Sequence, residues 1–317
     1  MNRIALLIAS LLLSAVATAQ PYPNKPIRVI VPFGAGSSTD VITRILTQSV
    51  SASIGQPFIV DNKPGGDGAV AGIEAAKAAP DGYTIFIGSG SPIAAVPALR
   101  KNPPYDSVND FTPITDIGRF TLFLFVNSEV PVKTFQEFIA YAKANPGKLA
   151  YGTGNASGIV AFAQMNQLAG IDMLHVPYKS APLAVVDLMT NRVQAMWEPP
   201  TTTLAAMKEG KLRALVTSLK SRSSVLPEVP TIAEAGMPQF SMANWMGLVG
   251  PAKLPREIVD RLNREFVAAM KRPEVIAAME KQLFQLNPTT PEQFAVFVKE
   301  QIESYGSLLR AAGVKPD

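Results

Sequence analysis

The chain has 317 residues, 47% of them hydrophobic, and no cysteine. The lack of cysteine excludes disulfides, zinc sites with thiolate ligands and cysteine nucleophiles. The formal net charge is +4, and the basic residues are scattered rather than clustered with aromatic residues, so the sequence does not predict nucleic-acid binding. A chain of this length can bury a sizeable core, and it favours two domains over one.

Residues 1–19 have the layout of a secretory signal peptide. Arg3 precedes an apolar run over 4–13, and Ala17-Thr18-Ala19 forms an A-x-A cleavage pattern. The alternative, a retained membrane anchor, would need about 20 apolar residues to span a bilayer. No later stretch is long and apolar enough to do so. We therefore expect a soluble mature protein in the periplasm, without a lipid attached through cysteine.

Short apolar strands alternate with helical patterns in the first third of the mature chain, which is typical of α/β proteins. Strands are expected at 27–31, 58–60 and 84–87. The first strand is followed by a glycine-containing turn and then by a helix whose apolar residues recur on one face. An alanine-rich helix is expected at 69–78.

The same pattern restarts after the proline-rich segment 102–106. A capping box at Thr134-Phe135-Gln136-Glu137 begins a helix. Then come a strand at 149–151, a turn at 152–157, a helix through 168, and further strands at 174–178, 193–197 and 212–217. A second capping box at 231–234 and the apolar segment 245–249 mark the return, and two C-terminal helices follow, the last from Thr290. We expect one lobe from 20–122 and 245–317, and a second lobe from 123–244.

The turn Phe33 to Asp40 places glycines and hydroxyl side chains between a strand and a helix. The unpaired amides and the dipole of a helix N-terminus attract a carboxylate or phosphate. An ordinary capped helix, with Ser38 or Thr39 as the N-cap, explains this turn equally well. The turn Gly152 to Ser157 repeats the arrangement in the second region, which favours ligand binding: two such turns on two lobes could hold two carboxylates of one molecule.

Catalytic and metal-binding patterns are absent from the sequence. The single histidine, His175, lies in a strand pattern, where a core or cross-strand role is expected. There is no G-x-S-x-G elbow, dinucleotide fingerprint or Walker lysine. Glu198 ends a strand and could face a cleft; alternatively, Trp197 is packed beside a solvated acid. We expect no enzymatic activity, no cofactor and no metal.

Four segments together resemble one known family. Residues 22–40, 78–84, 175–179 and 227–236 are similar to the Bug-type receptors of tripartite tricarboxylate transporters, and the similarity covers the mature chain in order. The resemblance implies a type II periplasmic-binding-protein fold: two lobes, two crossing segments, a hinge and a ligand cleft between the lobes. It also implies a small carboxylate ligand and two membrane partners, one large and one small.

The resemblance also implies which residues bind the ligand. In the family, turns matching 33–40 and 154–157 hold the ligand carboxylate, and loops matching 89–91 and 178–180 approach the rest of the ligand. The expected ligand-binding residues are Phe33, Gly34, Gly36, Ser37, Ser38, Thr39, Asp40, Ser89, Gly90, Ser91, Gly154, Asn155, Ala156, Ser157, Tyr178, Ser180 and Glu198.

Four positions depart from the family pattern. Ala35-Gly36-Ser37 replaces Pro-Gly-Gly, Ile159 to Ala161 stand where a histidine is common, Ser180 replaces a glycine, and Glu198 replaces an aspartate. These departures concern the ligand more than the fold. We expect a monomeric receptor for a di- or tricarboxylate or an aromatic carboxylate. A ligand sensor without a transport role is an alternative, and a periplasmic enzyme or a DNA-binding regulator is disfavoured.

Overall fold

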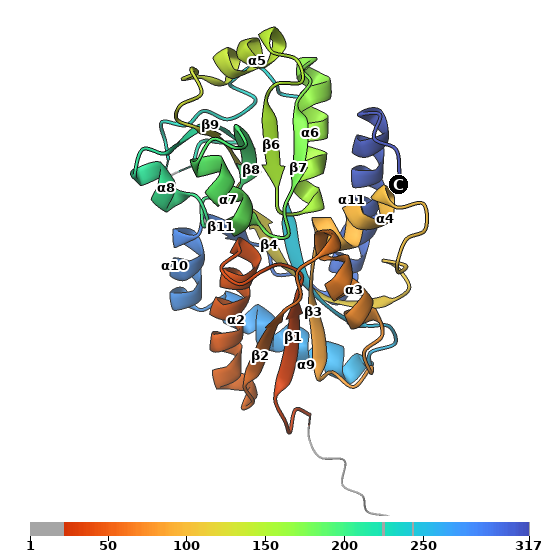
Figure 1. Ribbon diagram of the computed structural model, residues 1–317. Helices are drawn as coiled ribbons and strands as arrows, with labels where there is room; N and C mark the ends of the chain where they lie inside the picture. Colours follow the sequence, from red (N-terminus) through yellow and green to blue (C-terminus); the bar gives the residue numbers. More distant parts are fainter. Residues whose placement is uncertain (1–21, 224–225, 243, 317) are drawn as a thin grey trace, which may run out of the picture.

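The chain folds into two lobes, each centred on one β-sheet. The structure is a computed structural model and describes residues 22–223, 226–242 and 244–316. The predicted signal peptide, residues 1–19, lies outside the described residues. A six-stranded sheet forms the centre of the first lobe, at the bottom of Figure 1, and a five-stranded sheet that of the second lobe above it. The predicted two-lobed α/β fold is confirmed.

The strands of the first sheet come from both ends of the chain. They run in the order β11-β4-β10-β3-β1-β2, and those of the second sheet in the order β7-β6-β8-β5-β9. The bounds are β1 (Ile27–Val31), β2 (Phe58–Asn62), β3 (Thr84–Ser89), β4 (Phe111–Phe120), β5 (Phe123–Asn127), β6 (Ala150–Thr153), β7 (Leu174–Pro177), β8 (Ala195–Glu198), β9 (Leu212–Thr217), β10 (Trp245–Pro251) and β11 (Phe284–Leu286).

Helices cover the sheets and follow most of the parallel strands. Three helices, rather than the two expected, lie near the C-terminus, because a proline at the start of α10 begins a new helix after a short break. The bounds are α2 (Ser38–Ile54), α3 (Ala69–Ala76), the π-helix η3 (Gly90–Ala95), α4 (Val96–Leu99), α5 (Phe135–Ala144), α6 (Ala156–Ala169), α7 (Ala181–Met189), α8 (Leu204–Lys208), α9 (Arg256–Met270), α10 (Pro273–Lys281) and α11 (Pro291–Ala311).

Each sheet combines parallel strands with strands that run the other way: β10 and β11 in the first sheet, and β5 in the second. β1 is parallel to β2 and β3, and β6 is parallel to β7 and β8. β10 is antiparallel to β3, and β5 is antiparallel to β8. Helices that follow parallel strands begin at the carboxyl edge of the sheet. The starts of α2, α6 and α7 therefore lie on the edges of the two sheets that face each other (Figure 1).

The chain crosses between the lobes twice, after β4 and after β9. The two crossings are hydrogen-bonded to each other, since the Ser218 amide donates to the Leu122 carbonyl (2.9 Å) and the Phe120 amide to the Asn244 carbonyl (2.8 Å). The lobe boundaries that we propose, 122/123 and 244/245, lie in these connections. Paired crossings give the lobes one common hinge region.

Helix α11 packs against both lobes. Phe294 and Val298, near its start, belong to the buried cluster around Trp245 of the first lobe. Tyr305 and Leu309, near its end, belong to the buried cluster of the second lobe. Figure 1 shows the helix running alongside both lobes. The hydrophobic cores are thus joined through one helix as well as through the crossings.

Three local predictions need correction. The N-cap of α2 is Ser37, not Ser38 or Thr39, because Ser37 is still extended and Ser38 is already helical. The turn expected over 152–157 is shorter, since β6 continues through Thr153 and α6 begins at Ala156. The residues 231–234 make both capping-box hydrogen bonds but form a turn, and no helix follows them.

We predict that a methyl group added at Gly247 destabilises the fold. An alanine Cβ there would lie 2.1 Å from Phe294 Cζ, and both residues are buried. Such overpacking costs about 1–3 kcal/mol. Gly306→Ala is the control, because that Cβ would meet only the mobile end of Arg310 and alanine favours a helix interior. In urea unfolding, the free energy of unfolding should fall for Gly247→Ala and stay unchanged for Gly306→Ala. Equal effects of the two substitutions would contradict the packing of Gly247 against Phe294.

Candidate ligand-binding site

Helix α2 presents unpaired amides where β1 ends. Ser37 caps the helix, and its hydroxyl accepts a hydrogen bond from the Asp40 amide (3.3 Å). The first backbone bond of the helix runs from Val41 to Ser37 (3.0 Å). The amides of Ser38 and Thr39 precede that bond, so the helix itself provides no acceptor for them. They are available to an anion.

Two helices of the second lobe begin next to each other. Asn155 caps α6 by accepting from the Gly158 amide (3.1 Å), whereas the Ser180 side chain does not cap α7. Gly154 lies against the start of α7, so that a Cβ on it would come within 2.2 Å of the Ala181 nitrogen. Only glycine permits this approach, because any side chain would push the two helix starts apart.

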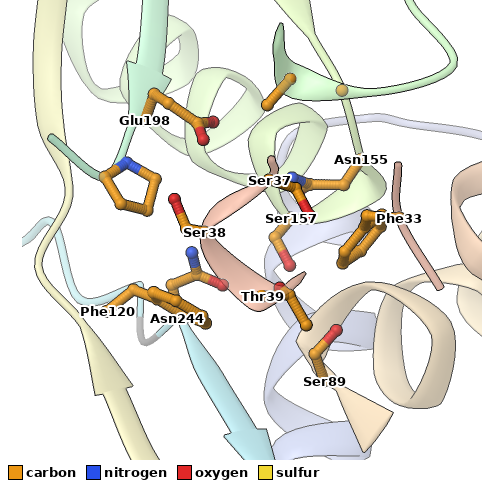
Figure 2. A pocket seen from close by; sticks show the side chains of 13 residues that line it. Phe33, Ser37, Ser38, Thr39, Ser89, Phe120, Asn155, Ser157, Glu198 and Asn244 are labelled. Atoms are coloured by element: carbon orange, nitrogen blue, oxygen red, sulfur yellow. The ribbon is translucent and has the colours of Figure 1, made fainter. Parts of the chain in front are cut away.

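These helix starts surround a small pocket between the lobes (Figure 2). Its volume is about 20 Å³, close to the space for one water molecule and far below the roughly 300–1,000 Å³ of small-molecule pockets. The lobes are therefore closed over it, and a ligand of several carbon atoms requires them to separate. The lining residues are Phe33, Ser37, Ser38, Thr39, Ser89, Phe120, Gly154, Asn155, Ser157, Ala181, Glu198, Pro199 and Asn244.

Nine of the predicted residues line this pocket. They come from both lobes: the start of α2 and the end of β3 on one side, the start of α6 and the end of β8 on the other. Their binding of a ligand stays a prediction. The nine are Phe33, Ser37, Ser38, Thr39, Ser89, Gly154, Asn155, Ser157 and Glu198.

The other eight predicted residues lie beside the pocket. Gly36 has a positive φ of 78° and donates its amide to the Asp40 carboxylate (3.0 Å). The Tyr178 hydroxyl donates to Asp187 (2.8 Å), away from the lining. Gly34 lies against the Ser180 side chain, across the contact between the lobes. The remaining three, Gly90, Ser91 and Ala156, form another contact between the lobes.

Asp40 supports the turn rather than the pocket. Its carboxylate accepts hydrogen bonds from the Gly36 amide, Arg44 and Asn62. Burial favours the neutral acid, but these donors outweigh burial and hold the pKa of Asp40 below its usual range. A charged Asp40 that is fully paired within its own lobe fixes the shape of the turn before α2.

Ser91 joins the two lobes at the edge of the pocket. Its hydroxyl donates to the Asp67 carbonyl (2.7 Å) and accepts from the Ala156 amide at the start of α6 (2.9 Å). Nearby, Ser157 Oγ and the Tyr305 hydroxyl lie 3.4 Å apart. The expected loop at 89–91 is instead the end of β3 and the first turn of η3. The amide of Ala156 is thus taken up in closing the lobes.

Four lining residues were not predicted. Phe120 ends β4 and Asn244 directly precedes β10, Pro199 follows β8, and Ala181 begins α7. None has a side chain that signals binding. The sequence signal that could have found Ala181 is the Ser180-Ala181-Pro182 start of a helix after a strand, a third copy of the strand–turn–helix pattern.

The pocket is polar but carries no positively charged side chain among its described lining residues. The hydroxyls of Ser38 and Ser89 are buried, at 5% and 3% exposure, and neither has a hydrogen-bond partner among the described residues. Buried hydroxyls without partners are unfavourable. Together with the helix amides, they supply donors that match an anion.

Glu198 is buried in the pocket, which corrects the reading of a solvated acid. Its side chain is 3% exposed, because β8 ends inside the contact between the lobes. The neighbouring Trp197 is packed as expected, with its ring stacked on Phe240 at 5.0 Å between centroids. Burial raises the pKa of Glu198 to about 8, and the hydrogen bond from Thr202 lowers it only in part.

His175 has the cross-strand role that the sequence predicts. It pairs with Tyr151 in the second sheet, and its Nε2 lies 2.7 Å from Thr153 Oγ1. Burial lowers its pKa.

Across the described parts of the chain, no three acidic or histidine side chains form a group that could hold a metal ion. Over the same residues, no helix is both long and apolar enough to cross a membrane.

Comparison with known proteins identifies the family. The family model described as tripartite tricarboxylate transporter family receptor matches residues 42–314. The protein BugT of Bordetella pertussis is 34% identical over 318 residues, with 98% of this chain and 97% of BugT covered. A solved structure described as R. palustris Rpa4515 with adipate has a TM-score of 0.90 and 28% identity, with 93% of this chain and all of that chain covered. MatC from Rhodopseudomonas palustris with bound malate has a TM-score of 0.86 and 28% identity, with 91% of this chain and all of that chain covered. The chain therefore belongs to the receptor family of the tripartite tricarboxylate transporters, whose members are solute-binding proteins and not enzymes.

Proposed function

We propose that the protein captures a small carboxylate in the periplasm and delivers it to a tripartite tricarboxylate transporter. One observation carries the proposal: the N-termini of α2, α6 and α7 meet at one pocket between the lobes, where two buried serine hydroxyls have no hydrogen-bond partner among the described residues. Each helix start favours negative charge. The solved relatives described with adipate and with malate hold small carboxylates.

Delivery to a transporter and location in the periplasm are further parts of this proposal. The family gives two expected partners, one large and one small membrane protein, and the export pattern of residues 1–19 gives the compartment. The receptor acts as a monomer that opens to admit the ligand and closes around it. Four or five hydrogen bonds from amides and hydroxyls can together supply the needed affinity, because hydrogen bonds to charged groups contribute roughly 1.5–3 kcal/mol each and micromolar binding requires about 8 kcal/mol. The cost of ordering the partners subtracts from this sum.

A thermal-shift screen tests capture directly. The mature protein is heated with adipate, malate, citrate, benzoate and nicotinate, and with the corresponding amides as neutral controls. At 100 times its Kd, a ligand should stabilise the protein by about 2.7 kcal/mol and raise the Tm by several degrees. We expect at least one acid to do so and its amide not to. Stabilisation by amides or sugars alone would contradict the proposal.

We predict that Ser38→Ala weakens carboxylate binding without destabilising the free protein. The Ser38 hydroxyl is buried and has no partner in the described part of the chain, so its removal costs the closed structure no hydrogen bond seen there. Loss of a hydrogen bond to a carboxylate should weaken binding by about tenfold or more. Ser107→Ala is the matched control, because the Ser107 hydroxyl is also buried and unpartnered but lies outside the pocket.

Calorimetric titration of both variants with the acid found in the screen gives the result. The Ser107 variant should bind as the wild type does. Equal affinities for wild type and Ser38→Ala would show that the start of α2 does not contact the ligand, and a lower Tm for the free Ser38 variant would show that its hydroxyl serves the fold instead.

A further inference from the structure

Glu198 is unusual in a pocket that we propose for an anion. Among the described residues that line the pocket, it is the one with a titratable side chain. Its Oε1 accepts a hydrogen bond from the Thr202 hydroxyl (3.2 Å). Figure 2 shows its carboxyl group pointing into the pocket from the second lobe, on the side where Ser38 of the first lobe points inward. An ionised carboxylate here would repel the ligand carboxylate at close range.

No charged side chain compensates Glu198 from the elements packed against it. β5 places Phe123 beside it, α2 contributes Ser38, and α7 contributes Ala181. The connection before β10 contributes Asn244. Within the described residues, none of these neighbours is charged, and no nearby charge contributes to the pKa shift of Glu198.

The charged residues on those elements pair elsewhere or are exposed. On α7, Asp187 pairs with Arg192. On α2, Asp40 pairs with Arg44; on the strand before the first crossing, Arg119 pairs with Asp116. On the connection before β10, Arg222 pairs with Glu234. Lys179 before α7 and Lys220 after β9 are exposed and do not line the pocket.

The protonated form of Glu198 therefore dominates at neutral pH. Burial raises its pKa to about 8, even though the hydrogen bond from Thr202 lowers it in part. A ligand carboxylate held nearby adds a second negative charge, which disfavours ionisation further and moves the pKa in the same direction. A cationic ligand group could instead pair with an ionised Glu198, but the three helix starts around the pocket disfavour a cation there.

We propose that Glu198 keeps its proton in the ligand-loaded receptor and donates it, as a hydrogen bond, to an acceptor oxygen at the end of the ligand away from the helix-bound carboxylate. This inference rests on the proposed function and narrows it. The preferred ligands carry a carboxylate at one end and a carbonyl or second carboxylate oxygen at the other. Binding is then linked to one proton: full affinity is present below the pKa of free Glu198 and is lost as the pH rises above it.

Infrared spectroscopy tests the protonation without a ligand. The difference spectrum between wild type and Glu198→Gln at pH 7 should contain the carbonyl band of a protonated carboxylic acid, and this band should disappear between pH 7 and 9.5. Glutamine keeps the shape of the side chain, so the variant should fold; its Tm serves as the check. Absence of the band at pH 7 overturns the inference, whatever the ligand.

Calorimetric titration with adipate, malate and citrate at pH 6.5 and pH 9 tests the linkage. For an acid that requires a proton on Glu198, binding should be about tenfold weaker at pH 9, since the pKa of the free group is about 8. Glu198→Gln should bind within a few-fold of wild type at pH 6.5 and lose most of the pH dependence. Asp116→Asn, a change of another buried carboxyl outside the pocket, should keep the pH dependence.

The outcomes separate the two proposals. If no acid of the thermal-shift screen, benzoate and nicotinate included, binds at pH 6.5, both the carboxylate function and the inference drawn from it are wrong. If an acid binds equally well at both pH values, or if Glu198→Gln binds more than tenfold more weakly at pH 6.5, the carboxylate function stands and the role of Glu198 is wrong. Weaker binding by Glu198→Gln at pH 6.5 would indicate that an ionised Glu198 pairs with a cationic group on the ligand.

Discussion

The structure depends on one constraint: helix-start amides without intrahelical acceptors must face one another across the two lobes. The starts of α2, α6 and α7 meet this condition only because each follows a strand that ends at the same edge of its sheet. The two sheets are oriented edge to edge by the paired crossings. In the proposed function, such a receptor binds its anion mainly through backbone amides, and the side chains around the pocket determine which anion is accepted.

Close packing of small residues determines how far the lobes close. Gly34 lies against Ser180. A Cβ added at Gly90 would lie 3.1 Å from Ser157 Oγ. Ser91 bonds to both lobes at the same contact. Small residues at these positions allow the lobes to come into contact, whereas larger side chains would hold the lobes apart. The small volume of the pocket between the closed lobes, about 20 Å³, thus depends on a few residues, mostly glycine and serine.

Much of the fold follows from the sequence because its signals are local. The apolar run of β1, the turn before α2 and the Thr290 capping box all act over a few residues, and each lies where the pattern predicts. The sequence also predicts that both turns belong to one site, since strand, glycine and hydroxyl occur in order in each, and residues of both turns line the pocket. The predicted N-cap, Ser38 or Thr39, lies one or two residues after the observed one, because three hydroxyl residues in a row can each act as a cap.

The rest of the site could not be read in this way, because it depends on contacts between distant segments. Phe120 and Asn244 are far apart in the chain and reach the pocket only through the hydrogen-bonded crossings. The burial of Glu198 requires the first lobe to cover the end of β8. Periodicity within β8 gives no measure of that burial, so the sequence left both a cleft-facing and a solvated Glu198 open.

Helix α11 has a consequence for how this protein unfolds. Its first half belongs to the core around Trp245 and its second half to the core around Phe162, so neither lobe can lose its structure without exposing apolar surface of the helix that the other shares. The two lobes are therefore one cooperative unit: calorimetry should detect a single heat-absorption peak whose calorimetric and van't Hoff enthalpies agree. A protein with two architectural lobes then behaves thermodynamically as one domain.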